Sequence, residues 1–210
     1  MQLAVFVGTK GRGSNLMAIH GAMVDGRLPG RIVAVVGTDI GAPAMVRAEE
    51  AGLPVVVVPA KGRDAAAYAA DLVRALRDAG ADTIALAGYL RILPEAVVDE
   101  WRHRIVNIHP ALLPSFGGKG MYGHHVHEAV LAYGAKVSGC TAHLVDREYD
   151  TGPVILQSTV VVEDDDTPES LAARLLPVEH ATFVEALRLV AEGRVRVEGR
   201  RVRLEPRRPS

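Results

Sequence analysis

Residues 3–36 read LAVFVGTKGRGSNLMAIHGAMVDGRLPGRIVAVV, and this stretch decides the fold. It contains the apolar run Leu3–Val7, the segment Asn15–Val24 and a second apolar run, Ile32–Val36. Short runs of apolar, β-branched residues favour buried strands, whereas the middle segment, rich in Ala, Leu and Met, favours a helix. Strand, helix and strand joined by short connections predict a parallel sheet that is covered by helices on both faces.

The same alternation continues to about residue 110. Gly52 and Gly80 stand where two further helices are expected to end, because the residue after a helix often needs a positive φ. Ligands of such sheets bind at the carboxyl ends of the strands. The further strands expected are Val55–Val58, Thr83–Leu86 and Ile105–Ile108, and the further helices are Ala42–Ala51 and Ala65–Ala79.

Beyond residue 110 the alternation loosens. Thr167 followed by Pro168 predicts the start of a long helix that continues to about Ala191. The stretch from Val195 to Leu204 alternates around Glu198-Gly199 and predicts a hairpin whose arginines face water and protect a sheet edge. The other elements expected here are a helix at Val126–Tyr133 and strands at Thr141–Val145 and Val154–Val162.

Composition limits the classes of protein. The chain has 210 residues and 49 % apolar residues, enough for one large domain without metals or disulfides. Its single cysteine, Cys140, suits a reducing compartment, and a net charge of −1 gives no general attraction to nucleic acid or to anionic membranes. The N-terminus lacks the pattern of a signal peptide. We therefore expect a cytoplasmic protein with neither a nucleic-acid nor a membrane partner.

Two motifs follow predicted strands. In Gly11-Arg12-Gly13-Ser14-Asn15 the small residues let the backbone approach an anion at the start of a helix, but a tight turn with an N-cap is equally compatible. In Asn107-Ile108-His109-Pro110 the first and third residues project to the same side of a strand. An amide beside an imidazole suits a reaction that develops an oxyanion and moves a proton, although a buried polar pair at a strand end remains an alternative.

Two other clusters are weaker signals. Asp150, in the stretch Asp146–Pro153, could orient a histidine and accept a proton, or could simply bond its own backbone in a turn. His124-His125-Val126-His127 suggests zinc, but Cys140 has no partner cysteine and the metalloprotease pattern is missing, so we expect no metal.

Taken together, these motifs resemble the glycinamide ribonucleotide (phosphoribosylglycinamide) formyltransferases, which are folate-dependent enzymes of purine synthesis. The resemblance covers about residues 3–190, in the order of the family. It rests on Gly13-Ser14-Asn15-Leu16, Leu86–Leu93, Asn107–Pro114, Asp150-Thr151-Gly152-Pro153-Val154-Ile155 and Glu179-His180.

The resemblance implies an α/β, Rossmann-like formyltransferase fold with a mostly parallel central sheet. It implies direct transfer of a formyl group from 10-formyltetrahydrofolate, as co-substrate, to the amine of 5'-phosphoribosylglycinamide. The implied catalytic residues are Asn107, His109 and Asp150, and Asp150 is expected to raise the pKa of His109 and to accept the amine proton. The residues implied for the ribonucleotide phosphate and ribose are Gly13, Ser14, Asn15, Arg63 and Glu179, and those for folate are Tyr89, Leu90, Arg91, Ile92, Leu93 and Asp146.

We expect a single domain, 1–210, that is a monomer or a homodimer. Its expected parts are a phosphate-binding half, 1–110, a folate-binding and catalytic half, 111–192, and a C-terminal hairpin and tail, 193–210. The Gly8–Asn15 loop and the loop at Gly117–Tyr122 are longer than is usual in the family, which leaves their geometry open. The alternatives are a methionyl-tRNA formyltransferase or a formyltetrahydrofolate hydrolase, each expected to need a further domain, and a non-catalytic nucleotide-binding module.

Overall fold

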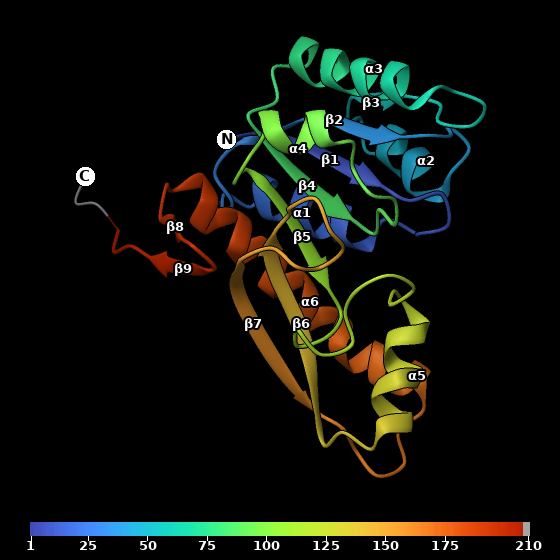
Figure 1. Cartoon of the computed structure of the whole chain (residues 1–210), viewed down its shortest axis with the longest axis vertical. Coiled ribbons are helices and arrows are strands. Elements are labelled where there is room, and N and C mark those ends of the chain that lie inside the picture. The colour runs from blue at the N-terminus through green and yellow to red at the C-terminus, as the bar shows by residue number, and fades with distance from the viewer. Residues whose placement is uncertain (208–210) are drawn as a thin grey trace. The chain divides into compact units, whose positions relative to one another are not determined.

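The computed structural model describes residues 1–207. Its chain forms two compact units, Met1–Val106 and the part that begins at Asn107. Each unit has its own set of strands and helices (Figure 1).

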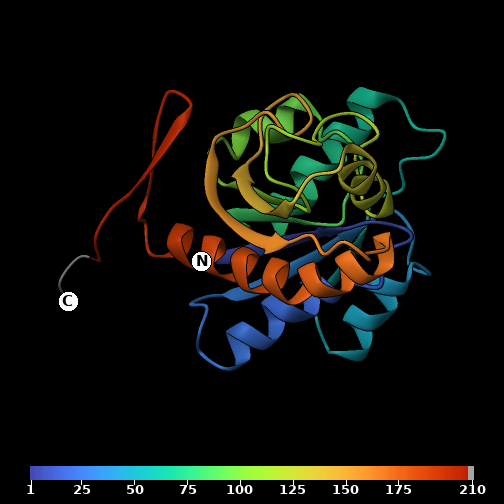
Figure 2. The same ribbon diagram turned by 90° about the horizontal axis from the view of Figure 1, so that it is seen from below.

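The first unit is built on four parallel strands in the order β3-β2-β1-β4. Helices α1 and α2 lie on one side of these strands, and α3 and α4 lie on the other (Figure 2). The strands are β1 (Gln2–Val7), β2 (Arg31–Gly37), β3 (Val55–Val57) and β4 (Thr83–Ala87), and the helices are α1 (Ser14–Val24), α2 (Pro43–Glu50), α3 (Ala65–Asp78) and α4 (Glu95–Glu100).

The core of this unit follows from the apolar runs. Strand β1 lies between β2 and β4, so that Leu3 to Phe6 are fully buried with helices on both faces. Helix α3 buries Tyr68, Leu72 and Leu76, which are spaced four residues apart and so share one face. Its first turn is capped by Asp64, whose carboxylate accepts the N–H of Ala67 at 3.0 Å.

The second unit contains an antiparallel strand pair, β6 and β7, with α6 packed along both strands and α5 packed on α6 (Figure 1). A two-stranded hairpin, β8 and β9, follows α6 and lies beside β7. Strand β5 (Ile105–His109) crosses the boundary between the units. The bounds are α5 His124–Tyr133, β6 Val137–Leu144, β7 Val154–Val161, α6 Pro168–Ala191, β8 Val195–Glu198 and β9 Arg201–Leu204.

The predicted α/β class with a mostly parallel sheet is confirmed, as are the Thr167 cap of α6 and the C-terminal hairpin. The start of β6 was predicted four residues too late, because Gly139 weakens a strand pattern. This glycine is required by packing, since a Cβ there would lie 2.1 Å from the Ser158 carbonyl oxygen. The short helix α4 was missed. The end of the predicted tail, residues 208–210, lies outside the described part.

Candidate active site

The glycine-rich loop connects β1 to α1. Gly13 is the N-cap of α1 with φ of 73°, and a Cβ there would lie 3.1 Å from the Ala44 Cβ, so that both the backbone conformation and the packing disfavour a side chain. Ser14 and Asn15 therefore lie in the first helical turn. The turn interpretation had assigned the N-cap to one of them, and the structure assigns it to Gly13 instead. Backbone N–H groups at such a helix start favour an anion.

The segment Tyr89–Leu93 follows β4 and lies next to the glycine-rich loop. A Cβ on Gly8 would stand 2.3 Å from the carbonyl oxygen of Gly88, so the chain after β1 and the chain after β4 are in close contact. The Tyr89 ring packs edge-on against Phe6 at 5.3 Å between centroids. This packing fixes the start of the segment.

The rest of this segment presents apolar side chains to solvent. Leu90 and Ile92 are 49 % and 52 % exposed, whereas Leu93 is buried. The Arg91 guanidinium lies 5.8 Å from the centre of the Tyr68 ring. Two half-exposed aliphatic residues at the carboxyl end of a strand form a surface that suits the flat face of a heterocycle.

Arg63 was implied as a phosphate ligand, and its side chain already has a partner. Its guanidinium donates a hydrogen bond to Asp71, which also pairs with Arg74 at 2.5 Å. The hydrogen bond from Arg63, together with the charges of both arginines, lowers the pKa of Asp71 despite some opposing desolvation. In the loop itself Arg47 donates to the Arg12 carbonyl at 3.3 Å.

The second unit brings three of the predicted residues together. Asn107 and His109 lie on β5, two residues apart, and Asp150 follows β6 in the connection to β7. Atom Nδ1 of His109 lies 3.6 Å from Oδ2 of Asp150, and Nε2 donates to the Phe116 carbonyl at 2.8 Å. The His109 side chain is only 5 % exposed. The expected catalytic group is therefore an assembled cluster within one unit.

His143 completes this cluster and was missed by the sequence analysis. Its Nδ1 donates to the Leu144 carbonyl at 2.9 Å, so that in the neutral ring Nε2 is an acceptor. That Nε2 lies 3.1 Å from Nδ2 of Asn107 and 3.6 Å from Oδ1 of Asp150. The signal that could have found it is a histidine inside the otherwise apolar end of β6.

Asp150 is held in an unusual conformation. Its φ is 57°, in the left-handed region that a residue with a Cβ seldom adopts. Its Oδ2 accepts the N–H of Gly118 at 2.9 Å. Burial raises the pKa of this carboxyl, but the nearby His143 imidazole, the field of His109 and the hydrogen bond from the Gly118 N–H outweigh burial and lower the pKa. Asp150 is thus an anion at neutral pH.

The pKa of His109 differs from expectation. We expected Asp150 to raise it, and the carboxylate does act in that direction. Burial of the imidazole is the larger effect, however, and the pKa of His109 is lowered from its ordinary value. His109 is accordingly neutral at pH 7, with its remaining lone pair on Nδ1 facing a carboxylate.

A buried polar network fixes the chain that follows His109. The Thr141 hydroxyl donates to the Ala111 carbonyl at 2.6 Å and accepts the N–H of Leu113 at 3.0 Å. Gln157 donates from Nε2 to the Leu113 carbonyl, also at 3.0 Å. Both side chains come from the β6–β7 pair. This pair therefore holds the segment after His109, in which the Phe116 carbonyl accepts the hydrogen bond from His109.

Asp146 and Glu179 lie in the same unit in different surroundings. Asp146 accepts the Thr151 hydroxyl at 2.6 Å and the N–H of Glu148 at 3.1 Å, which are bonds within its own loop. Glu179 is half-buried in α6, two residues after Pro177. Asp146 therefore has a clear structural role in the loop that carries Asp150.

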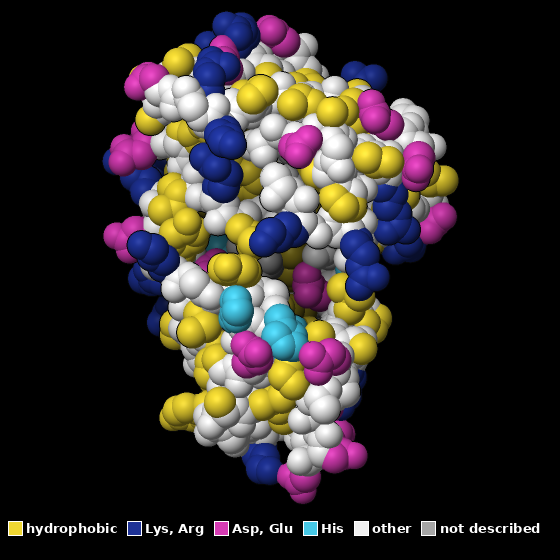
Figure 3. Space-filling model, turned by 90° about the vertical axis from the view of Figure 1, so that its right-hand side faces the viewer, with side chains coloured by type: hydrophobic (Ala, Val, Ile, Leu, Met, Phe, Trp, Pro, Cys, Tyr) yellow, Lys and Arg dark blue, Asp and Glu magenta, His cyan; other side chains and the backbone are white. Residues whose placement is uncertain are grey.

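The histidine run lies at the start of α5. His124 and His125 are exposed and pair with Glu128, each at 3.2 Å, and histidine side chains beside acidic ones are visible in Figure 3. Among residues 1–207 no group of three or more His, Cys, Asp or Glu side chains is arranged to hold a metal ion. No helix in that range is long and apolar enough to span a bilayer.

Several known proteins similar to this chain are formyltransferases. The family model described as formyl transferase matches residues 1–187. The chloroplastic phosphoribosylglycinamide formyltransferase of Arabidopsis thaliana is 45 % identical over 197 residues, 93 % of this chain and 67 % of that protein. The crystal structure of glycinamide ribonucleotide transformylase 1 from Symbiobacterium toebii has a TM-score of 0.89 at 38 % identity, over 98 % of this chain and 95 % of that one.

A formyltetrahydrofolate deformylase from Pseudomonas syringae shares the fold at lower identity. Its TM-score is 0.87 at 26 % identity, over 98 % of this chain but only 66 % of that chain. The expected Rossmann-like formyltransferase fold is confirmed by both solved structures.

Proposed function

The chain belongs to the formyl transferase family, among the phosphoribosylglycinamide formyltransferases, and from this premise we propose how its own residues carry out the transfer. The reaction moves a formyl group from 10-formyltetrahydrofolate to the amine of 5'-phosphoribosylglycinamide. The observation that carries the proposal is the cluster of Asn107, His109, His143 and Asp150 within one unit.

Asn107 stabilises the oxygen of the formyl group. When the uncharged amine attacks the formyl carbon, negative charge gathers on this oxygen, and an amide donor is required there. One N–H of Nδ2 points to His143, so that the second is free to face the substrate oxygen. His143 thereby sets the orientation of the amide, and Asn107 is the principal oxyanion donor.

His109 and Asp150 transfer the proton that the attacking amine loses. The attacking nitrogen loses a proton as the new carbon–nitrogen bond forms, and the folate nitrogen gains one as its bond to the formyl carbon breaks. Asp150, ionised at neutral pH, accepts the amine proton directly or through one water. His109, neutral before the reaction, takes this proton on Nδ1 from the Asp150 carboxyl, stabilises the oxyanion as an imidazolium, and supplies the proton that the departing folate nitrogen gains. Its Nε2–H must then turn from the Phe116 carbonyl to the oxyanion.

The ribonucleotide is held by groups of two kinds. The N–H groups at the start of α1, with Gly13, Ser14 and Asn15, bind its phosphate. Arg63 adds a cation if it leaves Asp71, and Glu179 accepts hydroxyl hydrogens of the ribose.

The folate is held by the segment after β4. Tyr89, Leu90, Arg91, Ile92 and Leu93 line its ring system, and the half exposure of Leu90 and Ile92 fits an apolar partner. Asp146 orders the Asp150 loop on the folate side. We further propose a cytoplasmic monomer or homodimer with neither a metal nor a nucleic-acid partner.

The test is a spectroscopic assay of folate deformylation with purified protein, with and without 5'-phosphoribosylglycinamide. A transferase releases tetrahydrofolate only when the ribonucleotide is present, at a rate equal to the formation of formylated product. Asn107→Ala, prepared in parallel, should be nearly inactive. Release of tetrahydrofolate that is independent of the ribonucleotide would identify a hydrolase instead. If no tetrahydrofolate is released with or without the ribonucleotide, the chain would be a non-catalytic nucleotide-binding module.

A further inference from the structure

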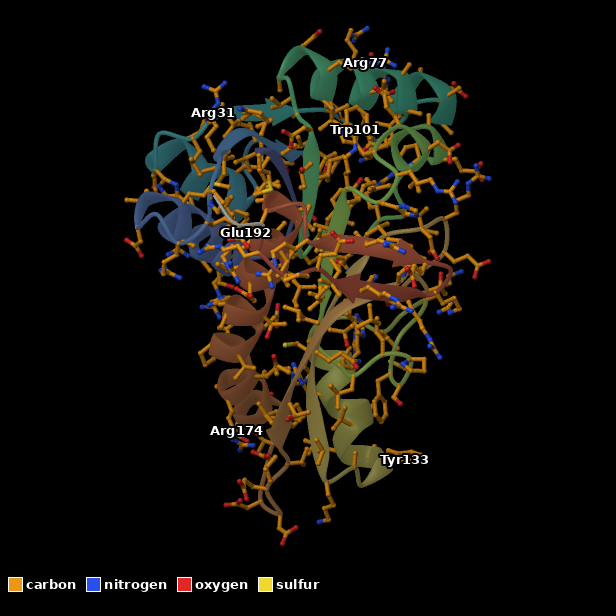
Figure 4. The ribbon with its side chains drawn as sticks, turned by 90° about the vertical axis from the view of Figure 1, so that its left-hand side faces the viewer. Arg31, Arg77, Trp101, Tyr133, Arg174 and Glu192 are labelled. Atoms are coloured by element: carbon orange, nitrogen blue, oxygen red, sulfur yellow. The ribbon has the colours of Figure 1, made fainter. Side chains whose placement is uncertain are left out.

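The C-terminal hairpin lies beyond the part of the chain that matches the family model, which ends at residue 187. Its base is fastened to the end of α6 through Glu192, which lies beside the hairpin (Figure 4). Glu192 accepts hydrogen bonds from Arg188 at 2.6 Å, Arg207 at 2.8 Å and Arg194 at 3.2 Å. A carboxylate shared by three guanidinium groups anchors the hairpin more firmly than an isolated surface pair would.

The tip of the hairpin reaches the loop that carries Asp150. Gly199, with φ of 61°, forms the turn, and the next residue, Arg200, donates from Nη2 to the Thr151 carbonyl at 2.9 Å. Thr151 directly follows Asp150 in the chain. The hairpin therefore holds the backbone next to the proposed proton acceptor.

The Asp150 backbone needs such support. A non-glycine residue in the left-handed region is strained, and this conformation persists only where its surroundings determine it. Two residues after Asp150, Gly152 packs so closely that a Cβ would lie 1.8 Å from the Leu144 carbonyl oxygen. Between them, the Thr151 hydroxyl is bound to Asp146. From outside the loop, the Gly118 N–H bonds the Asp150 carboxylate and Arg200 bonds the Thr151 carbonyl.

The neighbouring arginines of the hairpin do not bond the Asp150 loop. Arg196 and Arg203 both pair with Glu198, inside the hairpin itself. The Arg201 side chain makes no hydrogen bond or ion pair within residues 1–207 and is exposed. Arg200 is thus distinguished from its neighbours by its contact with the Asp150 loop.

We infer that Arg200 is a positioning residue, through which the C-terminal hairpin holds the Asp150 loop in its reactive conformation. The inference rests on the proposed role of Asp150 in proton removal. Arg200 touches neither substrate in this account, so its loss should lower kcat and leave the binding of both substrates unchanged.

The experiment compares the full-length variants Arg200→Ala, Arg200→Lys and Arg201→Ala with the unmodified chain. For Arg200→Ala we expect kcat to fall roughly 3- to 10-fold, the loss of about one hydrogen bond, with each KM changed less than about twofold. Arg200→Lys should recover part of the loss, because an ammonium group still donates. Arg201→Ala removes the adjacent charge and should behave like the unmodified chain.

Amide hydrogen exchange of residues 146–153 gives a readout that does not depend on activity. It should be faster in Arg200→Ala than in Arg201→Ala, because the Thr151 carbonyl has lost its donor. Unchanged kcat in Arg200→Ala overturns the inference, whether or not exchange accelerates. So does an equal loss of kcat in both arginine variants, which would indicate a general charge effect. Asp150→Asn serves as the reference: full turnover there defeats the proposed role of Asp150 in proton removal, separately from any result on Arg200.

Discussion

Nδ2 of Asn107 lies 3.1 Å from Nε2 of His143, and this contact decides which way the Asn107 amide faces. Because Nδ1 of His143 donates to the Leu144 carbonyl, Nε2 of the neutral ring can only accept. The amide nitrogen, not the amide oxygen, must then face the histidine. Its second hydrogen remains available to a substrate oxygen, which is the property that the proposed chemistry needs.

Loss of the imidazole of His143 should therefore impair the reaction without removing a group that touches substrate. We expect His143→Ala to lower kcat roughly tenfold, because the Asn107 amide is free to rotate. Both KM values should change little. His125→Ala, at an exposed histidine of α5, is the matched control. A normal kcat in His143→Ala would mean that other contacts orient the amide.

Asn107→Ala and His109→Ala should each lower kcat about 10²- to 10³-fold, the usual effect of losing one oxyanion donor. Circular dichroism and melting temperature should show an intact fold. Near-normal turnover in either variant would contradict the assigned oxyanion site.

Replacing Asp150 by asparagine should lower the pKa of His109 further. The carboxylate is the larger of the two influences that partly offset burial, the other being the bond to the Phe116 carbonyl, and the variant removes its charge while keeping its shape. Titration of the His109 ring followed by NMR measures this shift, with His125 as an exposed reference. Turnover should fall by orders of magnitude while ligand affinity stays nearly constant. An unchanged titration of His109 would show that the two groups are not coupled.

Stability should fall as the pH decreases below about 6.5, the ordinary pKa of histidine. Burial lowers the pKa of His109, His127 and His180, so below that pH the unfolded chain binds more protons than the folded chain. The contribution of these groups is thus present above pH 6.5 and is lost on acidification. His127 offers a test, since its buried Nδ1 has no hydrogen-bond partner within residues 1–207. The drop in melting temperature from pH 7.5 to pH 5.5 should be smaller in His127→Gln; an equal drop would exclude His127 as a source.

The combined variant Ser14→Ala and Asn15→Ala should weaken binding of the phosphorylated substrate much more than binding of folate. Both side chains lie in the first turn of α1, where the phosphate is proposed to bind. Isothermal titration with each ligand separates the two effects. Equal losses for both ligands would place the phosphate elsewhere.

Much of this molecule could be predicted from local sequence. The apolar runs Leu3–Val7 and Ile32–Val36 lie in β1 and β2, because a strand buried on both faces requires such runs. Asn107 and His109 were expected on one side of a strand because side chains alternate there, and both are found on β5. The start of α6 at Thr167 followed from capping chemistry alone.

Other features were decided only by contacts between residues far apart in the chain. His143 is 36 residues from Asn107, and no local pattern states that β6 brings them together. Gly139 weakened the strand prediction, yet it is required by the neighbouring backbone of β7. The net pKa of His109 likewise depends on how deeply the ring is buried, which the presence of Asp150 in the sequence does not reveal. Local sequence determines which elements form and which residue types they carry. Burial, tautomer and charge depend on the tertiary packing around each group, because desolvation and hydrogen bonding act through space.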